Sequence, residues 1–136
     1  MRVFLAHPKR WEDQHINEWR DALAAMLKAD DIDAEVVPGR DDFNLYMASE
    51  GTFSAWAKSV VERQDLVTRE RVYGAIVATT KGIGKATADI IGAAISAGVP
   101  VLLMEPVGSN QFQLGKVTQL VVVNERDFIN GWRLDT

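Results

Sequence analysis

Residues 73–104, YGAIVATTKGIGKATADIIGAAISAGVPVLLM, contain two apolar segments separated by a helix-forming segment. The first, Tyr73–Ala78, carries no charge, which is typical of a buried central strand. A polar turn with glycines follows, and then a helix is expected over Lys85–Ala97 that ends at Gly98, a residue suited to a helix C-terminus. Val99–Met104 is the next predicted strand. A strand, a helix and a second strand in this order predict a parallel βαβ unit.

The N-terminal half repeats this alternation of strand and helix. Val3–Ala6 is a short apolar strand that ends before Pro8, because proline has no N–H to donate to a sheet. A helix is expected next, since apolar residues recur there at helical spacing at positions 16, 19, 23, 26 and 27. A second strand is expected over Asp33–Val37. The segment Pro38–Gly51 is expected to be a binding loop or lid, as long loops in compact domains often are.

The remaining elements complete the predicted topology. A helix is expected from Phe53 to about Glu70, a fifth strand over Thr118–Val123, and a short helix or turn over Asp127–Thr136. Five strands separated by helices predict an α/β fold with a flavodoxin-like, doubly wound parallel sheet. Its expected strand order is 2-1-3-4-5, with helices on both faces. We expect one domain over residues 1–136.

The composition argues against several classes of protein. The 136 residues are 47% hydrophobic and 25% charged, as in ordinary globular domains. No apolar run approaches the roughly 20 residues of a membrane span. The absence of cysteine removes disulfides, thiolate zinc sites and cysteine nucleophiles. The net charge of −4 argues against binding along a nucleic-acid polymer. We therefore expect a soluble, cytoplasmic protein with no metal, no cofactor and a small-molecule ligand.

The topology predicts where that ligand binds. In doubly wound sheets ligands lie beyond the carboxyl ends of the strands, at the point where the strand order reverses. Here that point falls between the first and third strands, so His7, Asp41 and Asp42 are expected to surround one crevice with the turn over Thr79–Gly84. Tyr46, in the predicted loop, is expected to stack on a base.

The turn itself is expected to contact the ligand through Thr80, Gly82, Gly84 and Lys85. It opens a helix, whose free N–H groups suit an anion. It matches neither a Walker P-loop nor a dinucleotide fingerprint. An ordinary strand-to-helix turn with a solvated lysine is therefore the alternative interpretation.

Two carboxylates are candidates for chemistry. Asp89 lies near the first turns of the helix after the turn, where the helix dipole favours an ionised acid that could act as a nucleophile. Asp65 lies on the preceding predicted helix, and glycosidic chemistry often uses two carboxylates. The alternatives are an acid chosen only for the dipole at Asp89 and an i,i+4 pair with Arg69 at Asp65.

Short motifs along most of the chain resemble nucleoside 2-deoxyribosyltransferase-like proteins. RVFLAHP at Arg2–Pro8 resembles their first strand, and VERQD at Val61–Asp65 resembles the segment with their helix-borne aspartate. Ala75–Ala78, Gly84–Asp89 and Gly98–Val101 resemble, in order, their next strand, the helix start that follows it and their fourth strand.

This resemblance implies cleavage or transfer at the N-glycosidic bond of a nucleoside or nucleotide. Asp89 would be the nucleophile that forms a glycosyl-enzyme intermediate, and Asp65 would assist proton transfer. The turn before the helix would hold the sugar or the 5′ phosphate. Ser109 or Asn110 would reach across a homodimer or higher homo-oligomer. The chain departs from the family pattern in having aspartate instead of glutamate as nucleophile, and Ile91 where the family has glycine.

Two other functions stay open. The departures from the family pattern favour a non-catalytic nucleotide-binding or sequestering protein on the same scaffold, because fold does not determine function. A TIR-like domain that cleaves NAD is the third possibility, since Phe4–His7 and the amphipathic first helix also resemble the start of that fold. Release of a free base distinguishes catalysis from binding, and the identity of the substrate distinguishes the two catalytic alternatives.

Overall fold

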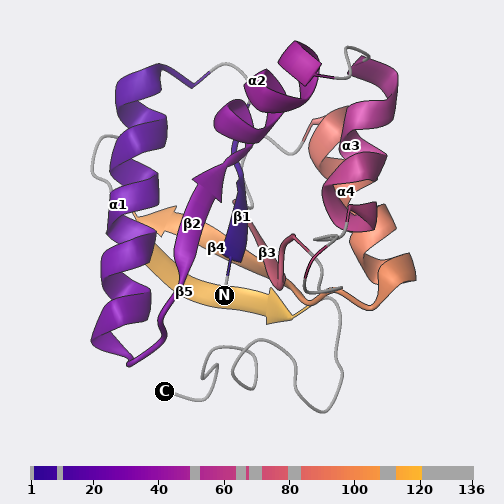
Figure 1. Cartoon of the computed structure of the whole chain (residues 1–136). Helices are drawn as coiled ribbons and strands as arrows, with labels where there is room; N and C mark the ends of the chain where they lie inside the picture. Colours follow the sequence, from indigo (N-terminus) through magenta and orange to yellow (C-terminus); the bar gives the residue numbers. More distant parts are fainter. Residues whose placement is uncertain are drawn as a thin grey trace.

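The computed structural model of the chain describes residues 2–8, 11–49, 53–63, 67, 72–79, 84–107 and 113–120. The elements in these ranges are β1 (Arg2–Ala6), α1 (Asp13–Ala29), β2 (Glu35–Pro38), α2 (Gly39–Ser49), α3 (Phe53–Glu62), β3 (Ala75–Thr79), α4 (Lys85–Ala97), β4 (Val101–Val107) and β5 (Gln113–Leu120). The strands form one sheet in the order β2-β1-β3-β4-β5 (Figure 1).

The first four strands are parallel and confirm the expected α/β sheet with the order 2-1-3-4. Phe4 of β1 pairs with Val37 of β2 on one side and with Ile76 of β3 on the other. Val77 of β3 pairs in turn with Leu102 of β4. The strand order therefore reverses between β1 and β3, which is the point where doubly wound sheets bind ligands.

The fifth strand runs antiparallel to β4, so the expectation of a fully parallel sheet is wrong at this edge. It covers Gln113–Leu120 instead of Thr118–Val123, and positions 121–123 lie outside the described residues. A parallel pair needs a crossover of about a dozen residues or more. Only residues 108–112 connect β4 to β5, and so short a connection allows only the antiparallel arrangement. The end expected over Asp127–Thr136 also lies outside the described part.

Helices cover both faces of the sheet, as expected. Side chains of successive strand residues point to opposite faces, and β1 shows this directly. Val3 and Leu5 pack with Leu23 and other apolar residues of α1 on one face. Phe4 and Ala6 belong to the second core cluster, which α3 and α4 cover. Figure 1 shows α1 on one side of the sheet and the α3–α4 pair on the other. No helix of the described ranges is long and apolar enough to cross a membrane.

The segment expected to be a loop over Pro38–Gly51 is mostly helical. Helix α2 begins where β2 ends and lies across the carboxyl end of β1 (Figure 1). Asp41 and Asp42 occupy its first turn, where the helix dipole favours acidic residues. Asp42 and Tyr46 are four residues apart, so they share one helix face, and both are buried. This helical spacing was the signal that the loop prediction overlooked.

The expected bounds of α3 are wrong at its C-terminal end, whereas those of α4 are confirmed. Helix α3 ends at Glu62, not near Glu70, because the Arg63 carbonyl already accepts a hydrogen bond from the distant Val72 N–H at 3.4 Å. Helix α4 matches its expected bounds. Gly98 ends it in the left-handed conformation at φ 72°, which glycine adopts without steric cost.

Candidate functional site

His7 lies at the carboxyl end of β1 and contacts the start of α2. Its Nε2 accepts a hydrogen bond from the Arg40 backbone N–H at 3.1 Å, and its Nδ1 lies 3.0 Å from the Pro8 carbonyl oxygen. An imidazole that accepts at one nitrogen and donates at the other is neutral. Burial is the main cause that lowers the pKa of His7. The Arg40 guanidinium lowers it further, while the Pro8 carbonyl and Asp41 act in the opposite direction. His7 thus provides a hydrogen-bond acceptor for a backbone N–H in the first turn of α2.

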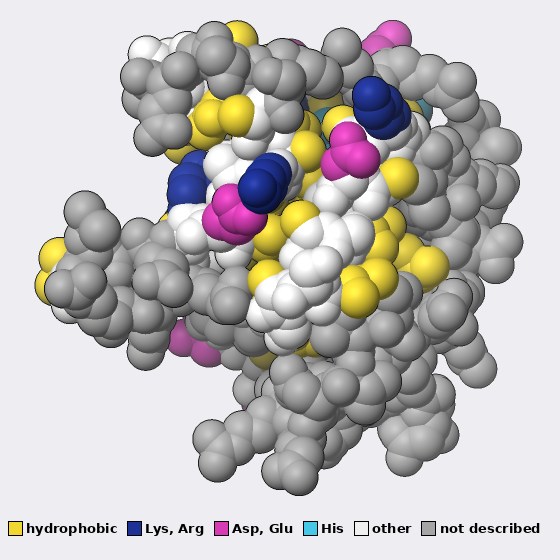
Figure 2. Space-filling view, turned by 90° about the vertical axis from the view of Figure 1, so that its right-hand side faces the viewer, with side chains coloured by type: hydrophobic (Ala, Val, Ile, Leu, Met, Phe, Trp, Pro, Cys, Tyr) yellow, Lys and Arg dark blue, Asp and Glu magenta, His cyan; other side chains and the backbone are white. Residues whose placement is uncertain are grey.

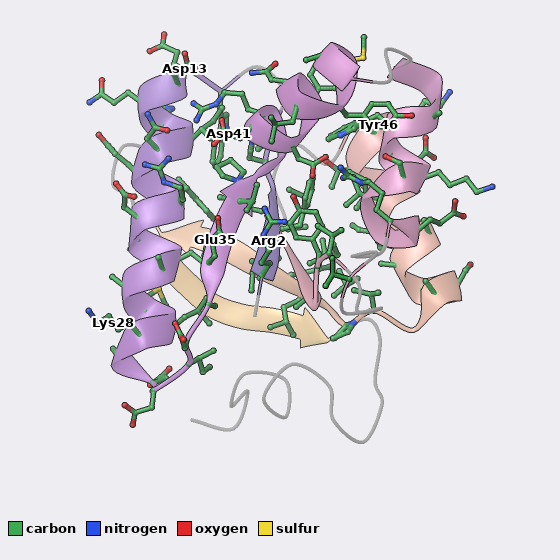
Figure 3. All side chains as sticks on the ribbon, viewed as in Figure 1. Arg2, Asp13, Lys28, Glu35, Asp41 and Tyr46 are labelled. Carbon is green, nitrogen blue, oxygen red and sulfur yellow. The ribbon has the colours of Figure 1, made fainter. Side chains whose placement is uncertain are left out.

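Arg40 connects α2 to α1 beside His7. Its guanidinium donates to the Asp41 carboxylate at 2.9 Å, to the Asp13 carboxylate at 3.2 Å and to the Asn17 side-chain oxygen at 2.9 Å. The hydrogen bond with Asp41 is the main cause that raises the pKa of Arg40. Figure 3 shows Asp13 at the start of α1 and Asp41 between α1 and α2. Asp41 therefore lies close to His7, as the topology predicts. Its carboxylate is paired with the Arg40 guanidinium.

Asp42 is the centre of a buried polar cluster that joins α2, α3 and the chain before β3. Its side chain accepts hydrogen bonds from Trp56 Nε1 at 2.8 Å and from the Tyr73 hydroxyl. Arg63 Nη2 donates to both of its carboxylate oxygens at 2.7 Å. We call these four residues the Asp42 cluster. A carboxylate that is only 3% exposed is tolerated because it is paired and hydrogen-bonded. A ligand would reach it only by displacing one of the three donors.

Tyr73 and Tyr46 are the aromatic residues around this cluster. Burial, and after it the hydrogen bond to Asp42, raises the pKa of the Tyr73 hydroxyl, which therefore remains a donor. Tyr46 was expected to lie in a loop and to stack on a base, and its placement in a loop is wrong. The residue is buried on α2, with the Arg63 guanidinium 6.0 Å from its ring centroid. Figure 3 shows it between α2 and α3.

The start of α4 follows β3 as predicted. Gly84 has an extended backbone at the N-cap position and is exposed, and Lys85 is exposed as well. Gly84 has no side chain with which to cap the first N–H groups of the helix. Five predicted site residues lie outside the described part of the chain, so their roles stay predictions: Asp65, Thr80, Gly82, Ser109 and Asn110.

Asp89 lies in a groove between α3 and α4. This α3–α4 groove has a volume of about 560 Å³ and is lined by Ala57, Lys58, Glu62, Asp89, Gly92, Ala93, Ser96 and Ala97. Figure 2 faces this side of the molecule and shows apolar side chains between charged ones. Asp89 is exposed, and the structure describes no hydrogen bond or ion pair for it among the placed residues. The groove is open to solvent, and its volume falls within the range of small-molecule sites.

Glu62 is the groove residue that the sequence interpretation missed. Among the described residues of α3, Glu62 is an acid that lines the same groove as Asp89. Asp65, the expected second carboxylate, lies outside the described residues, so its role stays a prediction. Its carboxylate lies 3.7 Å from Lys58 Nζ, one helical turn earlier. The signal was present in the sequence, because the buried positions Val60 and Val61 leave residues 58 and 62 on the flank of the helix.

A comparison with protein-family models, with curated proteins and with solved structures finds no match to this chain. The function has to be inferred from the residues themselves. In the described part of the chain, no three histidine or acidic side chains are grouped as metal ligands would be.

Proposed function

We propose that this protein binds a nucleoside or nucleotide in the α3–α4 groove and cleaves or transfers at its N-glycosidic bond, with Asp89 as the nucleophile. The observation that carries the proposal is the exposed carboxylate of Asp89, which has no described partner and lines a groove of about 560 Å³. Lys58 and Ser96 add hydrogen-bond donors for sugar hydroxyls, and Ala57 and Ala93 add apolar surface for a base.

The chemistry follows from the carboxylate. An Asp89 oxygen attacks C1′ of the sugar, the C1′–N bond breaks, and its electron pair leaves with the base, which takes up a proton from solvent. The ester between C1′ and Asp89 is the intermediate. Water, or the nitrogen of a second base, then attacks C1′ and loses a proton. The ester bond breaks, and the Asp89 carboxylate is restored.

The test is the release of free base from ribonucleosides, deoxyribonucleosides, their 5′ monophosphates and NAD, detected by chromatography. We expect Asp89→Asn to reduce release on the order of 10³-fold or more, because the nucleophile is lost. Asp21→Asn is the matched control, since Asp21 is an exposed helical aspartate on α1, far along the chain from the groove. Release that is equal in both variants would refute Asp89 as nucleophile. Release from NAD alone would favour the TIR-like alternative.

A non-catalytic nucleotide-binding protein is the second candidate. It is favoured by the hydrogen bonds that His7 and Asp42 make with other residues of the chain. Their polar atoms hold α2 in place instead of facing a ligand. Calorimetric binding of a nucleotide by the wild-type protein, with no base released from any substrate over many hours, would support this candidate over the catalytic one.

A further inference from the structure

The α3–α4 groove is lined by a second carboxylate, that of Glu62, besides the proposed nucleophile. Glu62 is the last residue of α3 and Asp89 lies in the second turn of α4, so the two acids approach the groove from different helices. Retaining glycosidic chemistry uses such a pair, one carboxylate that attacks carbon and one that transfers protons.

The two carboxylates differ in their partners. Asp89 has none among the described residues, and its side chain is exposed in the groove. Glu62 has Lys58, whose ammonium lies 3.7 Å away across one helical turn. A base whose side chain is oriented by a third group is the usual arrangement in covalent catalysis. The difference in partners therefore favours nucleophilic attack by Asp89 and proton transfer by Glu62.

The Asp42 cluster holds Glu62 in position through the next residue. Arg63 donates from its backbone N–H to the Ser59 carbonyl at 3.1 Å and from Nε to the same oxygen at 3.0 Å. Its Nη2 is bound to Asp42. The end of α3 is thus attached to the buried core directly after Glu62. Catalytic groups need such support from neighbouring hydrogen bonds to keep their geometry.

We propose that Glu62 is the general base of the groove, an inference that rests on the proposed function. In the second half of the reaction, a Glu62 oxygen takes the proton from the attacking water or from the N–H of the acceptor base. The attacking atom bonds to C1′, and the C1′–O bond to Asp89 breaks, with its electron pair returning to the carboxylate. Glu62 then gives the proton to solvent.

The experiment compares Glu62→Gln with Asp89→Asn on the substrate that the wild-type chain cleaves best. We expect Glu62→Gln to release about one equivalent of base per chain and then to turn over on the order of 10²-fold more slowly. Intact mass should show the glycosyl adduct. Azide attacks without losing a proton, so it should restore turnover and yield the glycosyl azide. Asp89→Asn should show no adduct and no response to azide.

Glu18→Gln is the matched control, because Glu18 is a partly exposed helical glutamate with an i,i+4 partner, Gln14, on α1. Glu62→Gln turning over like Glu18→Gln would overturn the inference, and so would a Glu62→Gln variant that forms no adduct and ignores azide. If the wild-type chain releases no base at all, the proposed function itself fails. Loss of release in Asp89→Asn with full turnover in Glu62→Gln removes only the role of Glu62.

Discussion

Asp42 and Asp89 are the same amino acid in opposite environments. Asp42 is 3% exposed and accepts hydrogen bonds from a tryptophan, an arginine and a tyrosine. Asp89 lies in an open groove without a described partner. A buried carboxylate must be paired to be tolerated, and its lone pairs are then occupied. An exposed carboxylate is solvated by water, which a substrate can displace. The difference separates a residue that holds the fold together from one that is available for chemistry.

The strongest test of this contrast is the stability of Asp42→Asn. The change removes the charge that Arg63 Nη2 contacts at both oxygens and leaves an amide that cannot accept from all three donors. We expect a loss of about 3 kcal/mol in the free energy of unfolding, at the lower end for a broken buried pair because the Arg63 side chain is 30% exposed. Urea unfolding measures this quantity.

Asp89→Asn serves as the contrasting variant in the same measurement. Its expected change in unfolding free energy is within about 0.5 kcal/mol, as for other surface substitutions. Equal effects of the two substitutions would contradict the distinction between the two aspartates, whatever their effects on base release.

His7 extends the comparison to a partly buried group whose ring nitrogens both contact backbone groups. Its lowered pKa means that the unfolded chain binds a proton more readily than the folded one. Stability should therefore be constant from pH 8 to about 6.5, the ordinary value for histidine, and fall as the pH is lowered further. Protonation removes the Nε2 acceptor from the Arg40 N–H and places a positive charge at the N-terminus of α2.

Urea unfolding between pH 5 and pH 8 checks this dependence. His7→Gln should lose about 1 kcal/mol at pH 7.5, the typical effect of a lost cap, and should show a flatter pH dependence. Both proteins keep His15, so the difference between the two curves isolates His7. Identical slopes would show that His7 does not control stability in this range.

A stabilising change is expected at Gly92, which lines the groove. A Cβ placed at Gly92, in the interior of α4, would meet no other atom within 4 Å. Gly92→Ala should therefore stabilise the protein by up to about 1 kcal/mol, because alanine is the better helix former. Its methyl group should also narrow the α3–α4 groove and weaken substrate binding.

Gly98→Ala provides the matched control on the same helix. Gly98 has φ 72°, where alanine is strained, so this variant should be destabilised by about 1 kcal/mol. Thermal unfolding of both variants decides the sign. Destabilisation by Gly92→Ala would mean that the groove is already filled in solution and is no open site.

The elements predicted well are those with strong local patterns. The apolar runs of β1 and β3 identified the central strands, and the spacing in α1 and α4 identified their helices. The wrong predictions concern α2 and β5, whose structure depends on features outside the local pattern of each segment. The sequence of α2 resembles a loop because its core-facing side carries the charged Asp42. The alternation of strands and helices predicts a parallel β5, but the connection 108–112 is shorter than a crossover needs, and β5 is antiparallel.

The sequence by itself determined the parallel β1–β4 sheet and the C-terminal end of α4, because strand runs, helical spacing and Gly98 act through neighbouring residues. Only the tertiary structure decided the roles of the acids. Asp42 meets Arg63 and Tyr73, which lie 21 and 31 positions away along the chain. Glu62 and Asp89 share a groove only because α3 and α4 pack on one face of the sheet. Such contacts depend on the folding of distant segments, which no local pattern encodes.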